Sequence, residues 1–230
     1  MSKGIVDIVF VIDSTGSMQP CIDAVKENIY TFVRTLCEKD GNGESIVKDW
    51  RGRVFGYRDY LCDSEKSVDN PFVATTEALR SQLDGLVAKG GGDEPESLLD
   101  ALLDVVNVEQ TDKNSQEVDP RKWRHRHLAA RCVIVFTDAT YHPTTAGGAG
   151  KVSDVINALH SNRIILSIYA PELPCHYELA EADKSEYFPI KVASSPQQAL
   201  AEFTADKMNF QKVMEALAKS VSKSANVPEL

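Results

Sequence analysis

The sequence lacks several patterns that mark enzymes and membrane proteins. It has no G-x-S-x-G nucleophile motif, and we recognise no nucleophile and base pair in it. The glycines at 90–92 are not followed by Lys-Ser or Lys-Thr, which excludes a Walker-type phosphate loop. No apolar run approaches the length of a membrane span, and residues 1–4 show no signal-peptide organisation. We therefore expect a protein without enzymatic activity and without membrane attachment.

Cysteine is scarce and scattered. The five cysteines occur singly, without a C-x-x-C pair, and their odd number does not suggest a disulfide framework. This usage argues for a reducing, cytoplasmic location. The formal net charge of −9 argues against bulk binding of nucleic acid or of anionic membranes.

The length and composition fit one domain. A chain of 230 residues with 43% hydrophobic content can bury a substantial core, and it shows neither an internal repeat nor a linker. We expect a single domain over residues 1–220 and a polar tail over residues 221–230. The sequence does not determine the oligomeric state.

Apolar patterning predicts alternating strands and helices. Continuous β-rich runs predict strands at residues 5–12, 53–57, 72–74, 132–137, 164–169 and 187–192. Helical spacing predicts helices at residues 22–36, 76–87, 95–106, 152–159 and 196–220, the last range divided into several helices. This alternation predicts an α/β fold, a doubly wound and mostly parallel sheet with helices on both faces. Residues 108–126 are irregular and are expected to form a surface insertion.

The first apolar run ends in a group of oxygen-bearing side chains. Asp13, Thr15 and Ser17 occupy alternate positions directly after this strand, so their oxygens can point to one place. Gly16 between the two hydroxyls suits a turn whose backbone approaches an ion closely. Because Mg²⁺ prefers hard oxygen ligands, the pattern predicts a magnesium site at the carboxyl end of the strand, where parallel sheets bind their ligands.

The pattern D-x-[ST]-x-S after an apolar strand resembles the metal-ion-dependent adhesion site of the von Willebrand factor type A (VWA) family. Two further segments strengthen the likeness. Residues 89–98, KGGGDEPESL, resemble the second, glycine-rich metal loop of the family, and residues 133–139, VIVFTDA, resemble the third. The three segments occur in the family's order and cover most of the chain, from about residue 5 to about residue 217.

The resemblance implies a set of metal ligands. Thr15 and Ser17 would bind through their hydroxyls, and Asp13 and Asp138 directly or through water. The second loop departs from the family pattern, which places threonine where an ungapped comparison puts Glu94. We expect Asp93 to be the ligand there, with Glu94 as the alternative. The expected ion is Mg²⁺, with Mn²⁺ and Ca²⁺ as alternatives.

Three other features lie near these motifs or stand out by charge. Arg58 is expected to form a surface pair with Asp59 or to meet a partner's acid, and His142 is expected to be a solvated loop residue. The basic run at residues 121–127, RKWRHRH, could dock an acidic partner or a nucleic-acid backbone. We favour a solvated run beside the following strand.

The resemblance implies a protein-interaction module and not an enzyme. A partner protein would be captured when its acidic side chain completes the metal shell, although an additional carboxylate at the ion would weaken this capture. Stand-alone intracellular members, such as the bacterial TerY-like kind, resemble adaptors in multi-component stress or defence systems. The alternative is a Mg²⁺-dependent phosphohydrolase with Asp13 as nucleophile. It lacks the second acid that haloacid-dehalogenase-like enzymes need, because Thr15 stands there.

Overall fold

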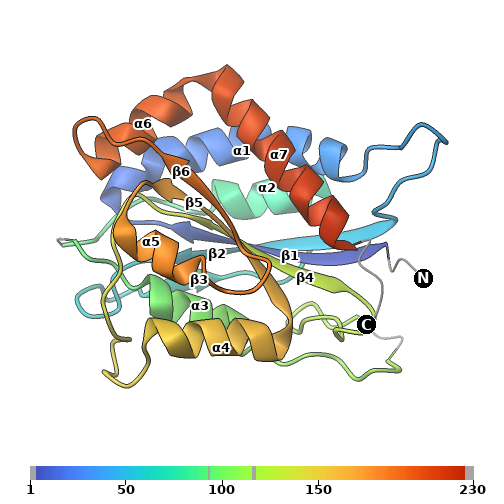
Figure 1. The fold of residues 1–230 in the computed structure, drawn as a ribbon, viewed down its shortest axis with the longest axis horizontal. Coiled ribbons are helices and arrows are strands. Elements are labelled where there is room, and N and C mark those ends of the chain that lie inside the picture. The colour runs from blue at the N-terminus through green and yellow to red at the C-terminus, as the bar shows by residue number, and fades with distance from the viewer. Residues whose placement is uncertain (1–3, 93, 116–117, 226–230) are drawn as a thin grey trace.

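A six-stranded sheet forms the centre of the protein (Figure 1). The structure is a computed structural model that describes residues 4–92, 94–115 and 118–225. The strand order is β3-β2-β1-β4-β5-β6, and every neighbouring pair is parallel except β2 with β3. The strands are β1 (Ile5–Asp13), β2 (Asp49–Tyr57), β3 (Ser67–Asp69), β4 (Ala130–Phe136), β5 (Ile164–Pro171) and β6 (Glu186–Ile190).

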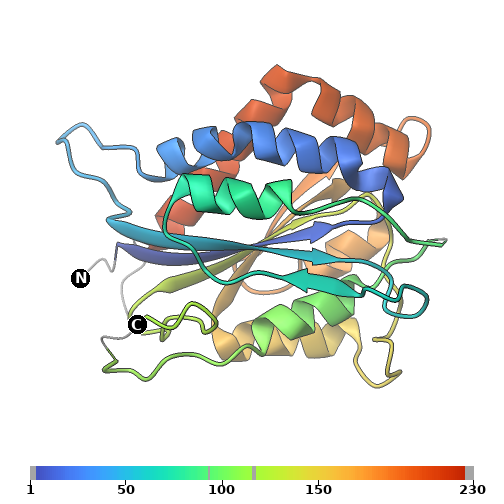
Figure 2. The ribbon, with the colours of Figure 1, turned by 180° about the vertical axis from the view of Figure 1, so that it is seen from behind.

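Helices flank this sheet. Figures 1 and 2 show α1, α2, α6 and α7 on one face and α3, α4 and α5 on the other. The helices are the short 3₁₀ helix η1 (Gly16–Met18), α1 (Gln19–Leu36), α2 (Thr76–Asp84), α3 (Leu98–Val106), α4 (Val152–Asn162), α5 (Pro174–Leu179), α6 (Pro196–Ala205) and α7 (Lys207–Ala225). The prediction of an α/β fold with a mostly parallel sheet is thus confirmed. Within the described residues, no helix has the length and apolar character needed to cross a membrane.

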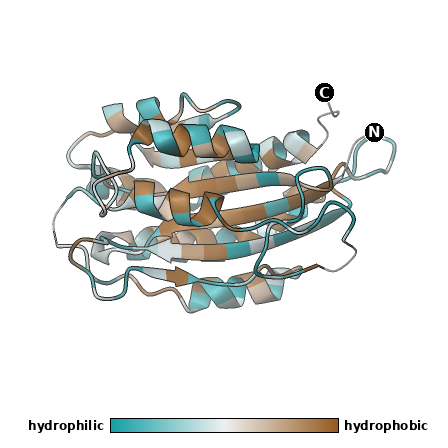
Figure 3. Ribbon diagram, turned by 90° about the horizontal axis from the view of Figure 1, so that it is seen from below, coloured by the Kyte–Doolittle hydropathy of each residue, from teal (hydrophilic) through white to brown (hydrophobic). Residues whose placement is uncertain are grey.

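The two faces of the sheet bury separate hydrophobic clusters. Phe10 and Ile12 of β1 belong to the cluster that includes α1 and α7, whereas Val9 and Val11 belong to the cluster that includes α3 and α4. Figure 3 shows the central strands as largely hydrophobic, while the helices mix hydrophobic and hydrophilic residues. A strand covered on both faces needs a continuous apolar run, which is why β1 could be predicted.

Several predicted boundaries differ from the structure. The edge strand beside β2 is β3 at residues 67–69, not residues 72–74, where Val73 forms only an isolated bridge with Gly52. Helix α3 begins at Leu98 and not at residue 95, because the backbone N–H of Glu96 donates to Thr140 O in a neighbouring loop. The sequence reasoning did not predict α5.

The last helix also extends further than predicted. α7 reaches Ala225, and Val221 and Ala225 are buried. The expected polar tail at residues 221–230 is therefore wrong for its first five positions, which continue the helix; residues 226–230 lie outside the described residues. Burial of one apolar side per turn explains why the helix continues here.

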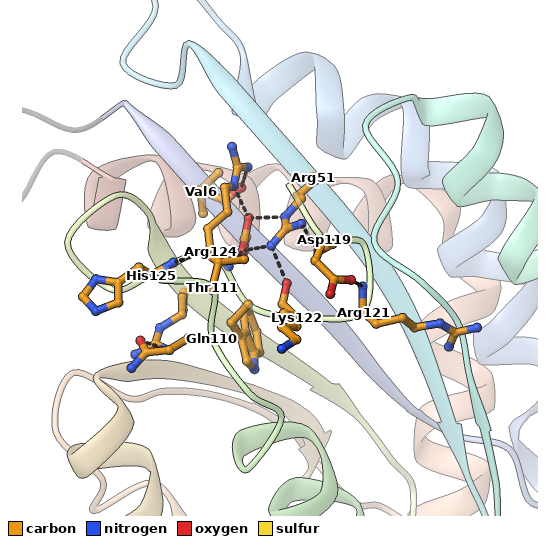
Figure 4. Close-up of polar contacts among 12 residues, drawn as sticks. Val6, Arg51, Gln110, Thr111, Asp119, Arg121, Lys122, Arg124 and His125 are labelled. Carbon is orange, nitrogen blue, oxygen red and sulfur yellow. Dashed lines mark hydrogen bonds and ion pairs between the residues drawn. The ribbon is translucent and has the colours of Figure 1, made fainter. Parts of the chain in front are cut away.

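The segment before β4 is not simply a surface insertion. Trp123 is fully buried, and its indole N–H donates to Val105 O at 3.0 Å. Arg124 is 7% exposed and donates through Nε to Asp7 Oδ1 at 2.7 Å, while Arg51 Nη2 donates to Asp7 Oδ2 at 2.8 Å. Figure 4 shows the side chains of Arg51 and Arg124 meeting beside β1. The prediction of a solvated basic run is wrong for Trp123, which packs against Phe72, and for Arg124, to which Asp7 supplies a buried counter-charge.

Candidate metal centre

The register of the sheet brings the first and third predicted motifs together. Ile12 of β1 lies opposite Phe136 of β4, so the residues that follow these two strands emerge side by side. The Thr137 hydroxyl donates to Asp13 Oδ2 at 2.9 Å, and Asp138 follows directly in the chain. Two acids far apart in the sequence therefore share the carboxyl edge of the sheet.

Asp13 is fully buried and has only neutral hydrogen-bond donors. Its Oδ1 accepts from the Thr15 backbone N–H at 2.9 Å and from the Thr15 hydroxyl at 2.7 Å. Burial and the charge of Asp138 together raise the pKa of Asp13 to about 7, although the hydrogen bonds from Thr15 and Thr137 act in the opposite direction. The carboxylate is thus held in place by groups that, among the described residues, bring no positive charge to compensate it.

Asp138 is 1% exposed, and neither of its carboxylate oxygens has a hydrogen-bond partner in the part of the chain that the structure describes. Burial raises the pKa of this carboxyl, with a contribution from Glu94, and the nearby Ser17 hydroxyl opposes the shift. A buried carboxylate without partners is costly, because desolvation penalises its charged form. Such oxygens are available to a ligand that brings positive charge.

Backbone hydrogen bonds tie the three loops together. The N–H of Gly16 donates to Gly90 O at 3.2 Å, which joins the first loop to the second. The N–H of Thr140 donates to Glu94 Oε1 at 2.7 Å, which joins the second loop to the third. Gly91 has a φ of +69°, and a Cβ there would lie 2.8 Å from both Glu96 Oε1 and Thr15 Cβ. Only glycine permits this approach without strain.

These loops enclose a pocket of about 220 Å³. The oxygen-bearing side chains that line it are Thr15, Ser17, Glu94, Glu96, Asp138 and Gln197. The glycines at 90–92 complete its wall. No lysine or arginine occurs among the described lining residues, so their only charges are negative.

Glu96 is an acid of this pocket that the sequence did not single out, and the lining Gln197 was not predicted either. It is 6% exposed, and its Oε2 lacks a hydrogen-bond partner within the described parts of the chain. Burial, together with the charges of Asp13, Asp59, Asp63 and Asp138, raises its pKa to about 9. Its position shortly after the glycine-rich loop was the available sequence signal. Asp93 and Glu94 lie closer to the glycines and were predicted as the ligands instead.

The structure places the predicted ligands as follows. Thr15, Ser17 and Asp138 line the pocket, and Asp13 lies buried behind Thr15. Asp93 lies outside the described residues, so its place is not known. Glu94, its alternative, also lines the pocket but is exposed, and it accepts a hydrogen bond from Thr140.

Two expectations about neighbouring side chains were wrong. Arg58 is buried and pairs with Glu65, whose Oε2 is 2.7 Å from Nη1, not with Asp59. His142 is partly buried, and its Nε2 lies 3.1 Å from Asp59 Oδ1. Asp59 also accepts from the Ser97 hydroxyl at 2.9 Å, so these residues brace the loops behind the pocket.

The donors suit a hard cation. Carboxylate and hydroxyl oxygens are the groups that Mg²⁺, Mn²⁺ and Ca²⁺ prefer, and the unpartnered oxygens of Asp138 and Glu96 face one pocket. Among the described residues, no group of three or more His, Cys, Asp and Glu side chains has the arrangement of a metal site by itself. The candidate centre therefore depends on the hydroxyls of Thr15 and Ser17 as well as on its acids.

The sequence of this chain shows limited similarity to known proteins. No family model matches the chain. A stretch of 108 residues, 46% of this chain, is 32% identical to an ariadne-like RING finger protein of Acanthamoeba polyphaga mimivirus and covers 10% of that protein. The chain thus spans only about a tenth of the length of this relative.

Two solved structures share the fold. Proximal thread matrix protein 1 from the mussel byssus is 15% identical, with a TM-score of 0.53 over 92% of this chain and 46% of that chain. The pilus adhesin SpaC from Lactobacillus rhamnosus GG, in its open conformation, is 13% identical, with a TM-score of 0.51 over 95% and 30% of the two chains. At these identities the likeness concerns the fold alone.

Proposed function

We propose that this chain is a metal-dependent protein-interaction module of the VWA type. Asp13, Thr15, Ser17 and Asp138 would hold a Mg²⁺ ion, with Mn²⁺ or Ca²⁺ as alternatives. The observation that carries the proposal is the buried carboxylate of Asp138, whose oxygens lack partners among the described residues and which shares a pocket with two hydroxyls. A divalent cation would supply the positive charge that the described lining lacks.

The arrangement of the sheet supports the same proposal. The strand order β3-β2-β1-β4-β5-β6 has β1 at its centre, and helices flank the sheet on both sides. We take this as a doubly wound, Rossmann-like arrangement of the VWA kind. The ligand of such a sheet binds at the carboxyl ends of its strands, which is where the pocket lies.

The proposed partner is a protein that places an oxygen ligand on the ion. An adaptor role in an intracellular, cytoplasmic stress or defence system remains our proposal, based on the family resemblance alone. The likeness to a small part of a larger RING finger protein is compatible with a module that works beside other domains. A phosphohydrolase is the weaker alternative, because both oxygens of the buried Asp13 already accept hydrogen bonds.

The test is affinity capture with the immobilised protein in the presence of Mg²⁺ or of a chelator. We expect bound proteins that are lost with the chelator and with Asp138→Asn, but kept with Glu109→Gln. Asp138→Asn preserves the shape of the side chain and removes its charge, and Glu109→Gln is the control, because the Glu109 side chain is 77% exposed and does not line the pocket. Capture that is equal under all four conditions would place the interface elsewhere.

A further inference from the structure

The strand β6 forms one edge of the sheet, and its outer side has no neighbouring strand among the described residues. The N–H of Glu172 donates to Ile190 O at 2.8 Å, so Ile190 directs its backbone toward β5. Successive residues of a strand direct their N–H and C=O groups to opposite sides, so Phe188 also faces β5, whereas Tyr187 and Pro189 face outward. The edge thus offers the N–H and C=O of Tyr187 and the C=O of Pro189, since proline has no N–H. Outside the ladder with β5, no described backbone group bonds to these two residues.

An exposed aromatic side chain lies beside this edge. Tyr177 of α5 is 49% exposed, and its ring centroid lies 4.9 Å from that of Tyr187, with the ring planes at 84°. The Tyr177 hydroxyl donates to Glu172 Oε1 at 2.8 Å, and the Tyr187 hydroxyl donates to Pro171 O at 2.6 Å. These contacts hold the ring of Tyr177 next to β6, while much of its side chain remains open to solvent.

The charge around this edge is strongly negative. Residues 172–186 include one lysine, no arginine and a set of exposed acids, none of which forms an ion pair with another described residue. These acids are Glu172, Glu178, Glu181, Asp183 and Glu186. Pairing of two copies of β6 is therefore unfavourable, because like charges would meet, whereas a cationic segment is attracted to the edge.

Arginine is the cationic residue that matches both the ring and the acids. Its planar guanidinium can lie over an aromatic face and pair with a carboxylate at the same time. Glu172 supplies such a carboxylate, in contact with the Tyr177 hydroxyl. In a strand added to the edge, side chains alternate between two sides, so every second residue would lie on the side of Tyr177.

We propose that the outer edge of β6 and the ring of Tyr177 bind an extended, arginine-containing segment of a partner protein. The segment pairs with the outward backbone groups of Tyr187 and Pro189 and places an arginine over Tyr177, beside Glu172. Because Pro189 keeps the ladder short, the arginine contacts supply much of the selectivity. None of these residues lines the metal pocket, so this contact does not depend on the proposed metal site.

The first test measures the fluorescence anisotropy of a labelled peptide in which arginine alternates with valine, at about 0.15 M salt and with a chelator present. We expect this peptide to bind the wild type, and a peptide with glutamate in place of arginine not to bind. Tyr177→Ala should weaken binding about two- to fivefold, as the loss of an exposed cation–π contact does.

Tyr30→Ala is the matched control. Tyr30 is 42% exposed on α1, and its replacement also leaves the net charge unchanged. Thermal melting verifies that both variants fold. Absence of binding to the wild type, or equal affinity of the two variants for the arginine peptide, would overturn the proposal.

The second test needs no variant. Amide hydrogen exchange, followed by nuclear magnetic resonance, reports the outward N–H of Tyr187 in the wild type. A saturating amount of the arginine peptide should slow this exchange about tenfold or more, because the N–H then donates to the added strand. The N–H of Phe188, which faces β5, is the internal reference and should change much less. An unchanged exchange rate of Tyr187 at saturation would mean that charge alone attracts the peptide, which would overturn the proposal.

Discussion

Asp7 and Asp13 lie on the same strand and are both fully buried, yet their surroundings differ in charge. Asp7 accepts four hydrogen bonds from two arginines: Arg51 donates through Nε and Nη2, and Arg124 through Nε and its backbone N–H. Asp13 accepts three bonds, all from the neutral groups of Thr15 and Thr137. Within the part of the chain that the structure describes, the amino end of β1 therefore contains its own counter-charge, and the carboxyl end does not.

The difference separates a structural acid from a binding acid. At the amino end, two guanidinium groups already compensate the carboxylate, so a ligand has nothing to add. At the carboxyl end, the described surroundings of Asp13, Glu96 and Asp138 offer no cation within the pocket. Burial of a charge without a partner is tolerated where a ligand completes the site, which is why we assign the metal to this end.

The largest effect on stability should come from removing Asp7, the acid that pairs with two arginines at the amino end of β1. Asp7→Ala leaves Arg51 and Arg124 buried without their acid, and we expect a loss of about 3–5 kcal/mol in the free energy of unfolding. Denaturant unfolding measures this loss. Asp49→Ala is the control, because Asp49 also pairs with Arg124 but its side chain is 55% exposed. Similar losses for the two variants would contradict a special role for Asp7.

The pH dependence of stability should reveal the acids without a counter-charge at the carboxyl edge of the sheet. The folded state raises the pKa of Asp13 from 3.8 to about 7 and that of Glu96 from 4.5 to about 9. The folded protein thus holds protons that the unfolded chain has released, so metal-free stability should fall as pH rises through these ranges. For Asp13 alone the fall between about pH 5 and about pH 8 is on the order of 2–3 kcal/mol. Saturating Mg²⁺ should remove most of it, as unfolding curves with and without the ion would reveal. A metal-free protein that gains stability over this range would contradict the account.

Neutralising an acid at the carboxyl edge of the sheet should stabilise the metal-free protein, whereas Asp7→Ala should destabilise it. Without metal at about pH 8, we expect Asp138→Asn to increase the free energy of unfolding by about 1–3 kcal/mol, because it removes a buried charge. With saturating Mg²⁺ the wild type should become the more stable of the two. Destabilisation of the metal-free protein by Asp138→Asn would mean that a group outside the described residues already pairs with this acid.

The smallest of these effects concerns the close approach of the loops. Gly91→Ala would place a Cβ against Glu96 and Thr15 at a positive φ, and we expect a cost of about 1–2 kcal/mol together with weaker metal binding. Gly147→Ala is the control, since nothing lies within 4 Å of its Cβ position. If Gly91→Ala bound Mg²⁺ as tightly as the control, the close approach of Gly91 to Glu96 and Thr15 would not matter for the site.

The sequence predicted the parts of the fold whose physical cause is local. The central strands are continuous apolar runs because both of their faces are covered, and each could be located to within a few residues. β3 was missed because a three-residue edge strand with Ser67 and Asp69 carries no apolar pattern. The burial of Arg124 could not be predicted because it depends on Asp7, and that of Trp123 because it depends on Val105 and Phe72, all of which lie elsewhere in the chain.

The same limit applies to the candidate site. Asp13, Thr15 and Ser17 are close in sequence, so their convergence could be predicted from spacing. Glu96 could not be distinguished from Glu94, because both are acids of one loop and only the fold determines which one is buried. The register of β1 and β4 decides that Asp138 joins Asp13, and an apolar run alone does not specify register.

The most direct test of the account is calorimetric titration of Mg²⁺ into the wild type, Asp138→Asn and the control Glu109→Gln at about pH 8, where the pKa of Asp13 no longer limits binding. The account predicts one bound ion per chain in the wild type and in Glu109→Gln, and loss of binding in Asp138→Asn. Absence of binding in the wild type, or equal affinity in Asp138→Asn, would contradict the claim that the unpaired acids form a cation site.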